Sequence, residues 1–248
     1  MDLFFLILIF IVSIFTSFIS TMVGSGGLIS IPVLLFFGFS APMAIATHRL
    51  GSLGLHLGSL TRFWNENKIR WNYVLPLLFL DLLSAFVGAN LLINADSNLL
   101  AHVLGFILLI LLPLTLLSKD FGVIPRNVST VRKLVGCIPY FLVGIWGGFF
   151  GGGAGTLIYW VYIYFFGFTL IEASATDKIP GFLSGVLAVF LFGLNNLIDF
   201  QVGFVMLVAM IIGSYLGAHV ALKQGNAWLK GLFAVVVFIL AVKLIFFK

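Results

Sequence analysis

Charged side chains are scarce in this chain. Of its 248 residues, 13 are Lys or Arg and 8 are Asp or Glu, which is 8% in total, whereas soluble globular proteins carry about 25%. Hydrophobic residues make up 62%, and the mean hydropathy is +1.22. The apolar runs do not alternate with polar residues as the strands of a membrane β-barrel would. The composition therefore predicts an all-α polytopic membrane protein and excludes an ordinary soluble domain.

Motifs for disulfides, metal binding and catalysis are also missing. Cys137 is the one cysteine of the chain, so it offers neither a disulfide framework nor a cysteine metal site. His48 and His56 would lie about 12 Å apart along a helix, too far to share one metal ion. The sequence has no HExxH, GxSxG or ATP-binding motif. We therefore expect no metal, no cofactor and no enzymatic activity.

The net charge of +5 does not indicate a nucleic-acid partner. Lys and Arg lie mainly in short segments between apolar runs, as the positive-inside rule predicts for cytoplasmic loops. The segment 118–133 contains four of them: Lys119, Arg126, Arg132 and Lys133. We expect this segment to be a cytoplasmic linker between two membrane units that are both embedded in the lipid bilayer. The oligomeric state stays open.

The apolar residues form eight long segments and two short ones. The long ones can each span a bilayer and cover about 3–23, 41–63, 74–93, 99–117, 134–150, 170–194, 200–222 and 228–247. The short ones, 28–37 and 156–166, reach only about 15 Å, which is half a bilayer core. We expect each short segment to be a broken or re-entrant helix.

The sequence repeats at an offset of 129 residues. Four pairs of matching positions follow this offset without a gap: 38–40 and 167–169, 44–47 and 173–176, 88–89 and 217–218, and Gly24 and Gly153. A match that keeps its register over so long a stretch predicts two homologous transmembrane repeats. We expect the first repeat to cover 1–117 and the second to cover 134–248, on either side of the linker 118–133.

The charges do not decide how the two repeats are oriented. An odd number of spans in each repeat gives inverted repeats, and an even number gives parallel repeats. Both topologies place equal numbers of Lys and Arg on the cytoplasmic side. We expect inverted repeats, because these are common in transporters with broken helices. A parallel pair is the alternative.

Each repeat has one cation inside a long apolar segment, Arg49 in the first and Lys178 in the second. Each lies about 13 Å into its segment, where a charge costs at least about 2.5–3.5 kcal/mol. These side chains could reach the surface, or pair with Asp177 to hold helices together. Because this cost recurs at equivalent positions of the two repeats, we predict that both cations converge on one binding site for an anion. A guanidinium group can bind such an anion by paired hydrogen bonds. Ser52 and His56 share the helix face of Arg49.

Glycine runs precede both short segments, at 24–27 and 151–155. Glycine permits tight turns and close backbone approach, and the free N–H groups of a helix N-terminus bind anions. Small residues also serve close helix packing in membranes. Since both runs lie directly before half-length segments, we predict helix breaks that point backbone amides at the substrate. The candidate glycines are Gly24, Gly26, Gly27, Gly152, Gly153 and Gly155.

Two further pairs of residues flank the cations. His48 and Asp177 occupy equivalent positions, and either could take up a coupling proton. Alternatively, Asp177 simply neutralises a neighbouring cation. Thr47 and Thr176 could donate hydroxyl hydrogen bonds to the anion, although threonine often bonds to the backbone of its own helix.

The segment 24–35 reads Gly-Ser-Gly-Gly-Leu-Ile-Ser-Ile-Pro-Val-Leu-Leu, and 46–49 reads Ala-Thr-His-Arg. The second repeat has Gly-Gly-Gly-Ala-Gly at 151–155 and Ala-Thr-Asp-Lys at 175–178. These motifs, spread over nearly the whole chain, resemble those of the sulfite exporter TauE/SafE family of membrane permeases. The resemblance implies a transporter of small anions, typically sulfur-containing ones such as sulfite or organosulfonates, in the bacterial cytoplasmic membrane.

The sequence therefore predicts a secondary transporter whose anionic substrate binds between the two glycine breaks while one repeat rocks against the other. An anion channel would fit a broken-helix site as well. An intramembrane enzyme is a more remote alternative, because Asp81 and Asp177 lie at non-equivalent positions of different repeats. A pure scaffold would have no need of two buried cations.

Overall fold

The chain folds into a bundle of helices. The computed structural model describes residues 3–24, 26–92 and 121–246, which contain eight helices and no strand. Four helices are long and apolar enough to cross a membrane, at Leu3–Val23, Trp71–Leu92, Leu170–Leu194 and Phe200–Val236. The prediction of an all-helical membrane protein is thereby confirmed. The predicted helix 99–117 and the first residues of the linker, 118–120, lie outside the described residues.

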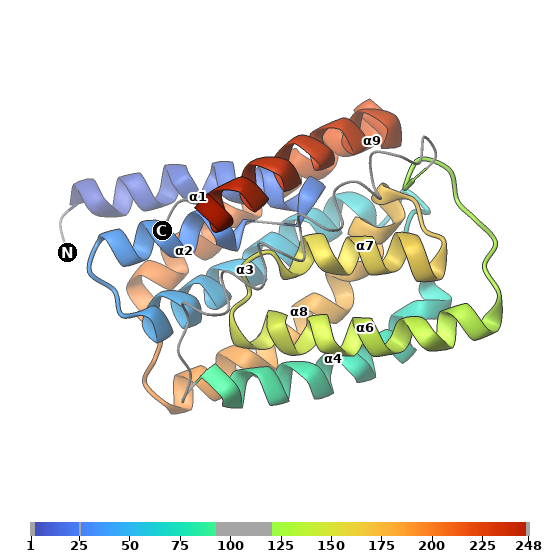
Figure 1. The fold of residues 1–248 in the computed structure, drawn as a ribbon. Helices are drawn as coiled ribbons and strands as arrows, with labels where there is room; N and C mark the ends of the chain where they lie inside the picture. Colours follow the sequence, from blue (N-terminus) through green and yellow to red (C-terminus); the bar gives the residue numbers. More distant parts are fainter. Residues whose placement is uncertain (1–2, 25, 93–120, 247–248) are drawn as a thin grey trace.

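The helices lie side by side with their long axes in a common direction (Figure 1). Their bounds are α1 Leu3–Val23, α2 Gly27–Phe36, α3 Ala41–Phe63, α4 Trp71–Leu92, α6 Thr130–Phe149, α7 Ala154–Phe166, α8 Leu170–Leu194 and α9 Phe200–Phe246. Three of the predicted segments, 3–23, 41–63 and 170–194, have the bounds of α1, α3 and α8. Within α9, Gly225 (φ 80°, ψ 176°) separates two helices, at the place where the sequence predicts a gap between 222 and 228.

The helix α6 begins four residues before its predicted start, inside the segment expected to be a linker. Its first turn is capped by Ser129, whose hydroxyl accepts a hydrogen bond from the backbone N–H of Arg132 at 3.3 Å. Basic residues near the helix start reduce hydropathy but do not prevent helix formation, so the hydropathy pattern missed this turn.

The two short helices begin at glycine breaks, as predicted. Gly24 has a φ of +84° and Gly153 a φ of +76°, a left-handed conformation that glycine adopts without the steric cost of a side chain. The two breaks meet: a Cβ on Gly24 would lie 2.3 Å from the carbonyl carbon of Gly155. The hydroxyl of Thr156 also donates a hydrogen bond to the Val23 carbonyl, at 2.7 Å. The starts of α2 and α7 are therefore packed against each other near the centre of the bundle.

The long helices pack through glycines that let backbones approach closely. Along α3, a Cβ on Gly54 would lie 2.1 Å from the carbonyl oxygen of Leu207 in α9, and one on Gly58 would lie 2.2 Å from that of Ile211. On the other side of α3, Gly181 of α8 contacts His56, and Gly185 contacts Leu53. The numbering therefore rises together along α3 and α9, whereas α3 and α8 run in opposite directions.

Two hydrogen bonds between helices are related by the 129-residue offset. The Thr47 hydroxyl in α3 accepts from the backbone N–H of Asp199, just before α9, at 3.0 Å. The Thr176 hydroxyl in α8 accepts from the backbone N–H of Arg70, just before α4, also at 3.0 Å. Each threonine thus ties its helix to the N-terminus of a helix in the other half of the chain.

Replacing Gly54 with Ala is expected to destabilise the protein, because the added methyl group would overlap the Leu207 carbonyl and force α3 and α9 apart. Overpacking of this kind costs about 1–3 kcal/mol. Thermal unfolding of the purified protein in detergent measures the effect. Gly231→Ala is the matched control, because a Cβ there meets no atom within 4 Å; equal melting temperatures for the two variants would contradict the predicted packing.

Candidate functional site

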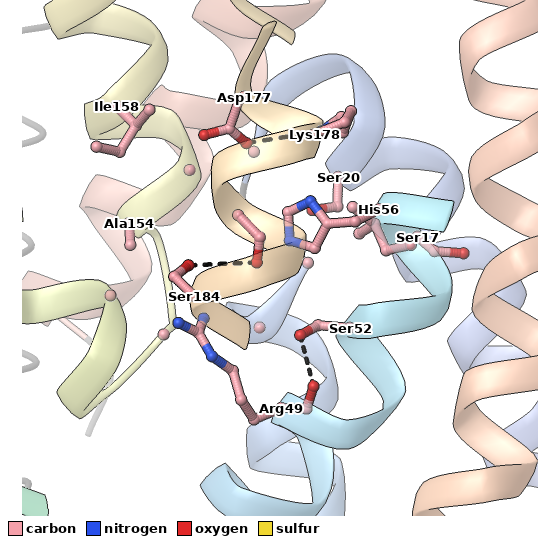
Figure 2. A pocket seen from close by; sticks show the side chains of 18 of the residues that line it. Ser17, Ser20, Arg49, Ser52, His56, Ala154, Ile158, Asp177, Lys178 and Ser184 are labelled. Atoms are coloured by element: carbon pink, nitrogen blue, oxygen red, sulfur yellow. Dashed lines mark hydrogen bonds and ion pairs between the residues drawn. The ribbon is translucent and has the colours of Figure 1, made fainter. Parts of the chain in front are cut away.

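A polar cavity of about 100 Å³ lies where the two glycine breaks meet. Side chains from α1, α3, α4, α6, α7, α8 and α9 line it, so both halves of the chain contribute (Figure 2). A volume of this size holds several water molecules or one small ligand. The cavity is therefore the candidate substrate site.

Arg49 and Lys178, the two cations singled out in the sequence, both line this cavity. The Arg49 Nε atom is buried and has no hydrogen-bond partner among the described residues. No carboxylate of the described part of the chain lies within 4 Å of the Arg49 guanidinium. The guanidinium of this cavity-lining residue therefore has a hydrogen-bond donor that the described residues do not use.

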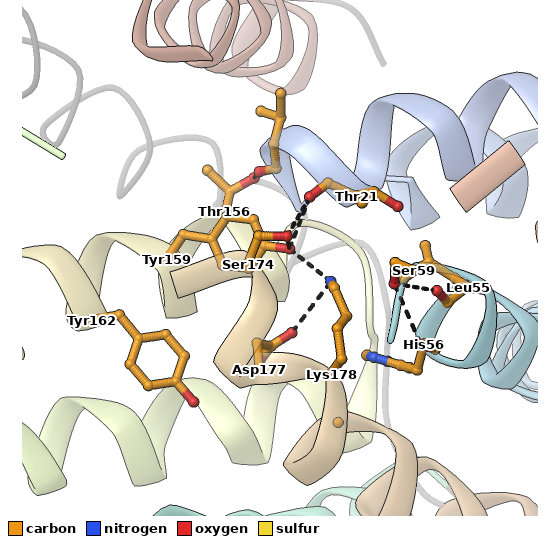
Figure 3. A network of polar contacts seen from close by, with 12 residues as sticks. Thr21, Leu55, His56, Ser59, Thr156, Tyr159, Tyr162, Ser174, Asp177 and Lys178 are labelled. Atoms are coloured by element: carbon orange, nitrogen blue, oxygen red, sulfur yellow. Dashed lines mark hydrogen bonds and ion pairs between the residues drawn. The ribbon is translucent and has the colours of Figure 1, made fainter. Parts of the chain in front are cut away.

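Lys178 is buried, with 1% of its surface exposed, and its ammonium group is fixed by two neighbours. Its Nζ atom donates a hydrogen bond to the Tyr159 hydroxyl at 2.9 Å and lies 3.8 Å from Oδ2 of Asp177. The Tyr159 hydroxyl in turn lies 3.3 Å from the Ser174 hydroxyl, which donates to the Thr21 carbonyl at 2.6 Å (Figure 3). This chain of contacts joins α8, α7 and α1 and holds Lys178 at the cavity wall.

Two carboxylates, Asp81 and Asp177, line the same cavity. Sequence reasoning treated them as unrelated because they occupy non-equivalent positions, yet the packing of α4 on α8 brings both to one place. Asp81 lies beside the Ser184 hydroxyl. The sequence did contain a signal for Asp81: it is an acidic residue inside an apolar segment, and such residues in membrane helices mark functional sites. With neutral histidines, two cations and two carboxylates give the cavity a formal charge of zero.

The two cavity histidines differ in their hydrogen bonding. His48 is 7% exposed, and its Nδ1 atom lies 2.8 Å from the Ser30 hydroxyl. His56, which shares the Arg49 face of α3 as the sequence predicted, has a buried Nδ1 atom without a hydrogen-bond partner in the described chain. Its ring covers Gly181, where a Cβ would come within 2.4 Å of Cε1.

The glycines predicted to face the substrate divide into two groups. Gly24, Gly26, Gly27 and Gly155 line the cavity. Gly152 and Gly153 lie outside the lining; a Cβ on Gly152 would meet Phe150 and Leu28, and its carbonyl accepts a hydrogen bond from the Trp146 indole at 3.0 Å. These two glycines therefore shape the break before α7 without contacting the cavity.

Thr47 and Thr176, expected as hydroxyl donors to the anion, are not part of the cavity lining. Both are fully buried, and their hydroxyls accept the hydrogen bonds from Asp199 and Arg70 described above. The packing of each threonine against the helix start of the other half explains why it faces away from the cavity.

Several hydroxyl-bearing side chains of the cavity were missed by the sequence analysis. They are Thr16, Ser17 and Ser20 of α1, Tyr159 of α7 and Ser184 of α8. Hydroxyl groups of serine and threonine in membrane helices often bond to the backbone of their own helix, as Ser17 does with the Ile14 carbonyl at 3.0 Å. Their contribution to a site depends on which helices face each other, and this is not visible in the sequence.

Replacing Tyr159 with Phe is expected to lower the melting temperature, because the buried Lys178 ammonium would lose a hydrogen-bond acceptor. Hydrogen bonds to charged groups contribute about 1.5–3 kcal/mol. Thermal unfolding tests this, with Tyr164→Phe as the control: Tyr164 is 42% exposed, and its ring contact with Arg132 persists in phenylalanine. Indistinguishable melting temperatures would show that the Tyr159 hydroxyl does not support Lys178.

A multi-pass helical membrane protein with a charged cavity between broken helices has the architecture of a membrane transporter. The model of the sulfite exporter TauE/SafE family matches residues 9–244, and the chain belongs to this family.

Three relatives share nearly the full length of the chain. The "Probable membrane transporter protein" of Haemophilus influenzae is 28% identical over 241 residues, covering 97% of this chain and 94% of the relative. The "Probable membrane transporter protein YfcA" of Escherichia coli K12 is 26% identical, covering 96% and 88%. The "Probable membrane transporter protein ORF9" of a Sinorhizobium species is also 26% identical, covering 96% and 91%. No solved structure matches this chain.

Proposed function

We propose that this protein is a secondary transporter of the cell membrane that binds a small anion in the cavity between α3 and α8. The class of substrate that fits best is a sulfur-containing oxyanion or organosulfonate such as sulfite, as the family's description implies. The observation that carries this proposal is the presence of both Arg49 and Lys178 in the lining of one cavity.

The chemistry of the cavity supports an oxyanion. An arginine guanidinium can bind two oxygen atoms of a planar or tetrahedral anion at once, and Arg49 has an unused Nε donor. The Lys178 ammonium adds a second positive charge from the opposite half of the chain. Backbone N–H groups at the glycine breaks add neutral donors. These groups replace the water that an oxyanion gives up on entering the membrane.

We also propose that 1–117 and 134–248 are two inverted repeats. Helix starts support this: α3 and α8 begin at Ala41 and Leu170, and α4 and α9 at Trp71 and Phe200, 129 residues apart in each case. The hydrogen bonds of Thr47 and Thr176 obey the same offset and are reciprocal, which is typical of a two-fold relationship. Because the equivalent helices α3 and α8 run in opposite directions, such an axis would invert one repeat relative to the other.

The charges of the loops agree with inversion. The loop after α3, 64–70, contains Lys68 and Arg70 and follows Arg62, whereas the equivalent loop after α8, 195–199, contains no Lys or Arg. Although the total counts of Lys and Arg are equal for the two topologies, this difference between equivalent loops favours a cytoplasmic first loop and an external second loop. The proposed carrier would then expose its cavity to the two sides in turn as the two repeats rock about the α3–α8 crossing.

Cysteine labelling tests the inverted topology. Asn65→Cys and Asn195→Cys, each in a Cys137→Ser background, place single thiols in the two equivalent loops, and both positions are exposed. We expect an impermeant maleimide added to intact cells to label Asn195→Cys and not Asn65→Cys, which should react only after the cells are opened. Labelling of both thiols from the same side would contradict inversion and support parallel repeats.

Transport in proteoliposomes tests the anion site. Replacing Arg49 or Lys178 with Gln should lower sulfite uptake at least about tenfold, because each variant removes a charged hydrogen-bond donor to the anion and leaves a cavity carboxylate without a balancing cation. Lys223→Gln is the control, because Lys223 is exposed and lies outside the cavity. Wild-type rates in both cavity variants would refute the site. Saturable counterflow of labelled sulfite is the expected kinetic pattern, and single-channel conductance steps would identify a channel instead.

A further inference from the structure

One cavity side chain has a polar atom that neither the fold nor the anion site of Arg49 and Lys178 accounts for. Among the described residues, four buried side-chain nitrogen or oxygen atoms lack a hydrogen-bond partner: Ser13 Oγ, Arg49 Nε, His56 Nδ1 and Trp160 Nε1. Only Arg49 and His56 of these four line the cavity. A buried polar atom without a hydrogen-bond partner costs about 1–3 kcal/mol of stability. We therefore expect the unpaired atoms of the cavity to gain hydrogen-bond partners when the substrate binds.

His56 differs in this respect from the second cavity histidine. The Nδ1 atom of His48 lies 2.8 Å from the Ser30 hydroxyl, which fixes its ring to α2. The Nδ1 atom of His56 has no such contact, although its ring lies in the cavity beside Lys178 (Figures 2 and 3). A neutral imidazole with its hydrogen on Nε2 leaves Nδ1 as a free proton acceptor.

Charge balance provides the second argument. The empty cavity holds two cations and two carboxylates, with a formal sum of zero. A bound anion with one negative charge would leave the site with one unbalanced charge, and an unbalanced buried ion costs several kcal/mol. One additional positive charge at the cavity wall removes that cost.

We propose that His56 is the proton site of the carrier, and that each singly charged anion enters the cavity together with one proton. A hydronium ion in the open cavity gives up a proton: its O–H bond breaks, a neutral water molecule remains, and a bond forms to Nδ1 of His56. When the anion leaves, this N–H bond breaks and the proton returns to a water molecule. In the loaded state, the new N–H group donates a hydrogen bond to the anion. This inference rests on the proposed anion transport and adds the coupling ion to it.

The titratable groups that line the same cavity as His56 are His48 and Arg49 of α3, Asp81 of α4, Tyr159 of α7, and Asp177 and Lys178 of α8. Lys178 and Arg49 are the two cations that share the cavity with His56, and an anion bound beside them reduces their repulsion of a proton on its ring. The carboxylates are already needed: Asp177 lies 3.8 Å from Lys178, and Asp81 is the second negative charge that balances the cations. His56 is therefore the group left to take up the proton.

The place of His56 in the fold suits this role. Its ring rests on Gly181 where α3 and α8 cross in opposite directions, which is the contact about which the two repeats are proposed to rock. The rocking motion that exposes a bound anion to the other side of the membrane would therefore also expose a proton on His56.

Proton uptake on anion binding tests this inference directly. The purified protein in detergent is titrated with methanesulfonate in weakly buffered solution containing a pH indicator, and binding is followed by calorimetry in buffers of different ionisation heat. Methanesulfonate is fully ionised at neutral pH, so any proton taken up belongs to the protein. We expect about one proton for each anion bound. Binding without proton uptake in the wild-type protein would overturn the inference, whatever the variants do.

Two histidine variants assign the proton to its residue. His56→Gln should still bind methanesulfonate, more weakly, with proton uptake lost, because glutamine donates a hydrogen bond but does not titrate. His219→Gln is the matched control, because His219 is exposed and lies outside the cavity; its proton uptake should equal that of the wild type. Full proton uptake by a folded His56→Gln variant would move the proton to another group and refute the assignment.

Transport measurements separate this inference from the proposed function. In proteoliposomes, a pH gradient should drive methanesulfonate accumulation, and an imposed membrane potential should not, because one anion and one proton move together without net charge. Uptake driven by the potential and not by the pH gradient would refute proton coupling while leaving anion transport intact. Absence of binding and uptake for methanesulfonate, sulfite and sulfate alike would refute the proposed function, and the coupling with it.

Discussion

Charge neutrality within a low-dielectric interior is the constraint on which this structure depends. An uncompensated charge in the hydrocarbon region of a membrane is costly, and the part of the chain that the structure describes has four formally charged side chains in its central cavity. It compensates them by bringing both cations and both carboxylates to the wall of one cavity. The result is a polar chamber that is neutral when empty, inside a protein in which 8% of the residues are charged.

The chamber exists because glycines allow the backbones around it to approach closely. Gly24 and Gly155 bring the starts of α2 and α7 together, and Gly54 and Gly58 let α3 lie directly on α9. Larger side chains at these positions would keep the helices apart. With glycine there, the helix backbones touch, and the cavity beside these contacts is lined by Arg49, Lys178 and their partners. Close packing and the polar site are thus consequences of the same small residues.

The helices were predictable from the sequence because hydropathy and glycine position act locally. The bounds of α1, α3 and α8 agree with the predicted segments, and both short helices begin near the predicted breaks. The 129-residue offset led us to expect Arg49 and Lys178 near one site, and both line the same cavity. Asp81 was missed because the other charged residues of the cavity come from distant helices, and only the packing of α4 on α8 brings Asp81 to the same cavity as Asp177.

Thr47 and Thr176 were assigned to the site on the basis of proximity along the chain to Arg49 and Lys178. Neighbouring residues on a helix point in different directions, about 100° apart, so a residue two positions away from a cavity side chain need not face the same space. Their actual partners, the helix starts at Arg70 and Asp199, belong to the other half of the chain. A pattern within one segment contains no information about such partners.

These reciprocal threonine bonds have a consequence for biogenesis. The first half of the chain leaves the ribosome before its interaction partners in the second half have been synthesised. Thr47 is made before Asp199, whose backbone N–H it binds, and α3 is made before α9, against which it packs. At 5–20 residues per second, synthesis of the intervening stretch takes on the order of ten seconds. During that interval the polar faces of α3 are inserted without their final neighbours, so the nascent chain depends on the membrane insertion machinery to shield them until the second half arrives.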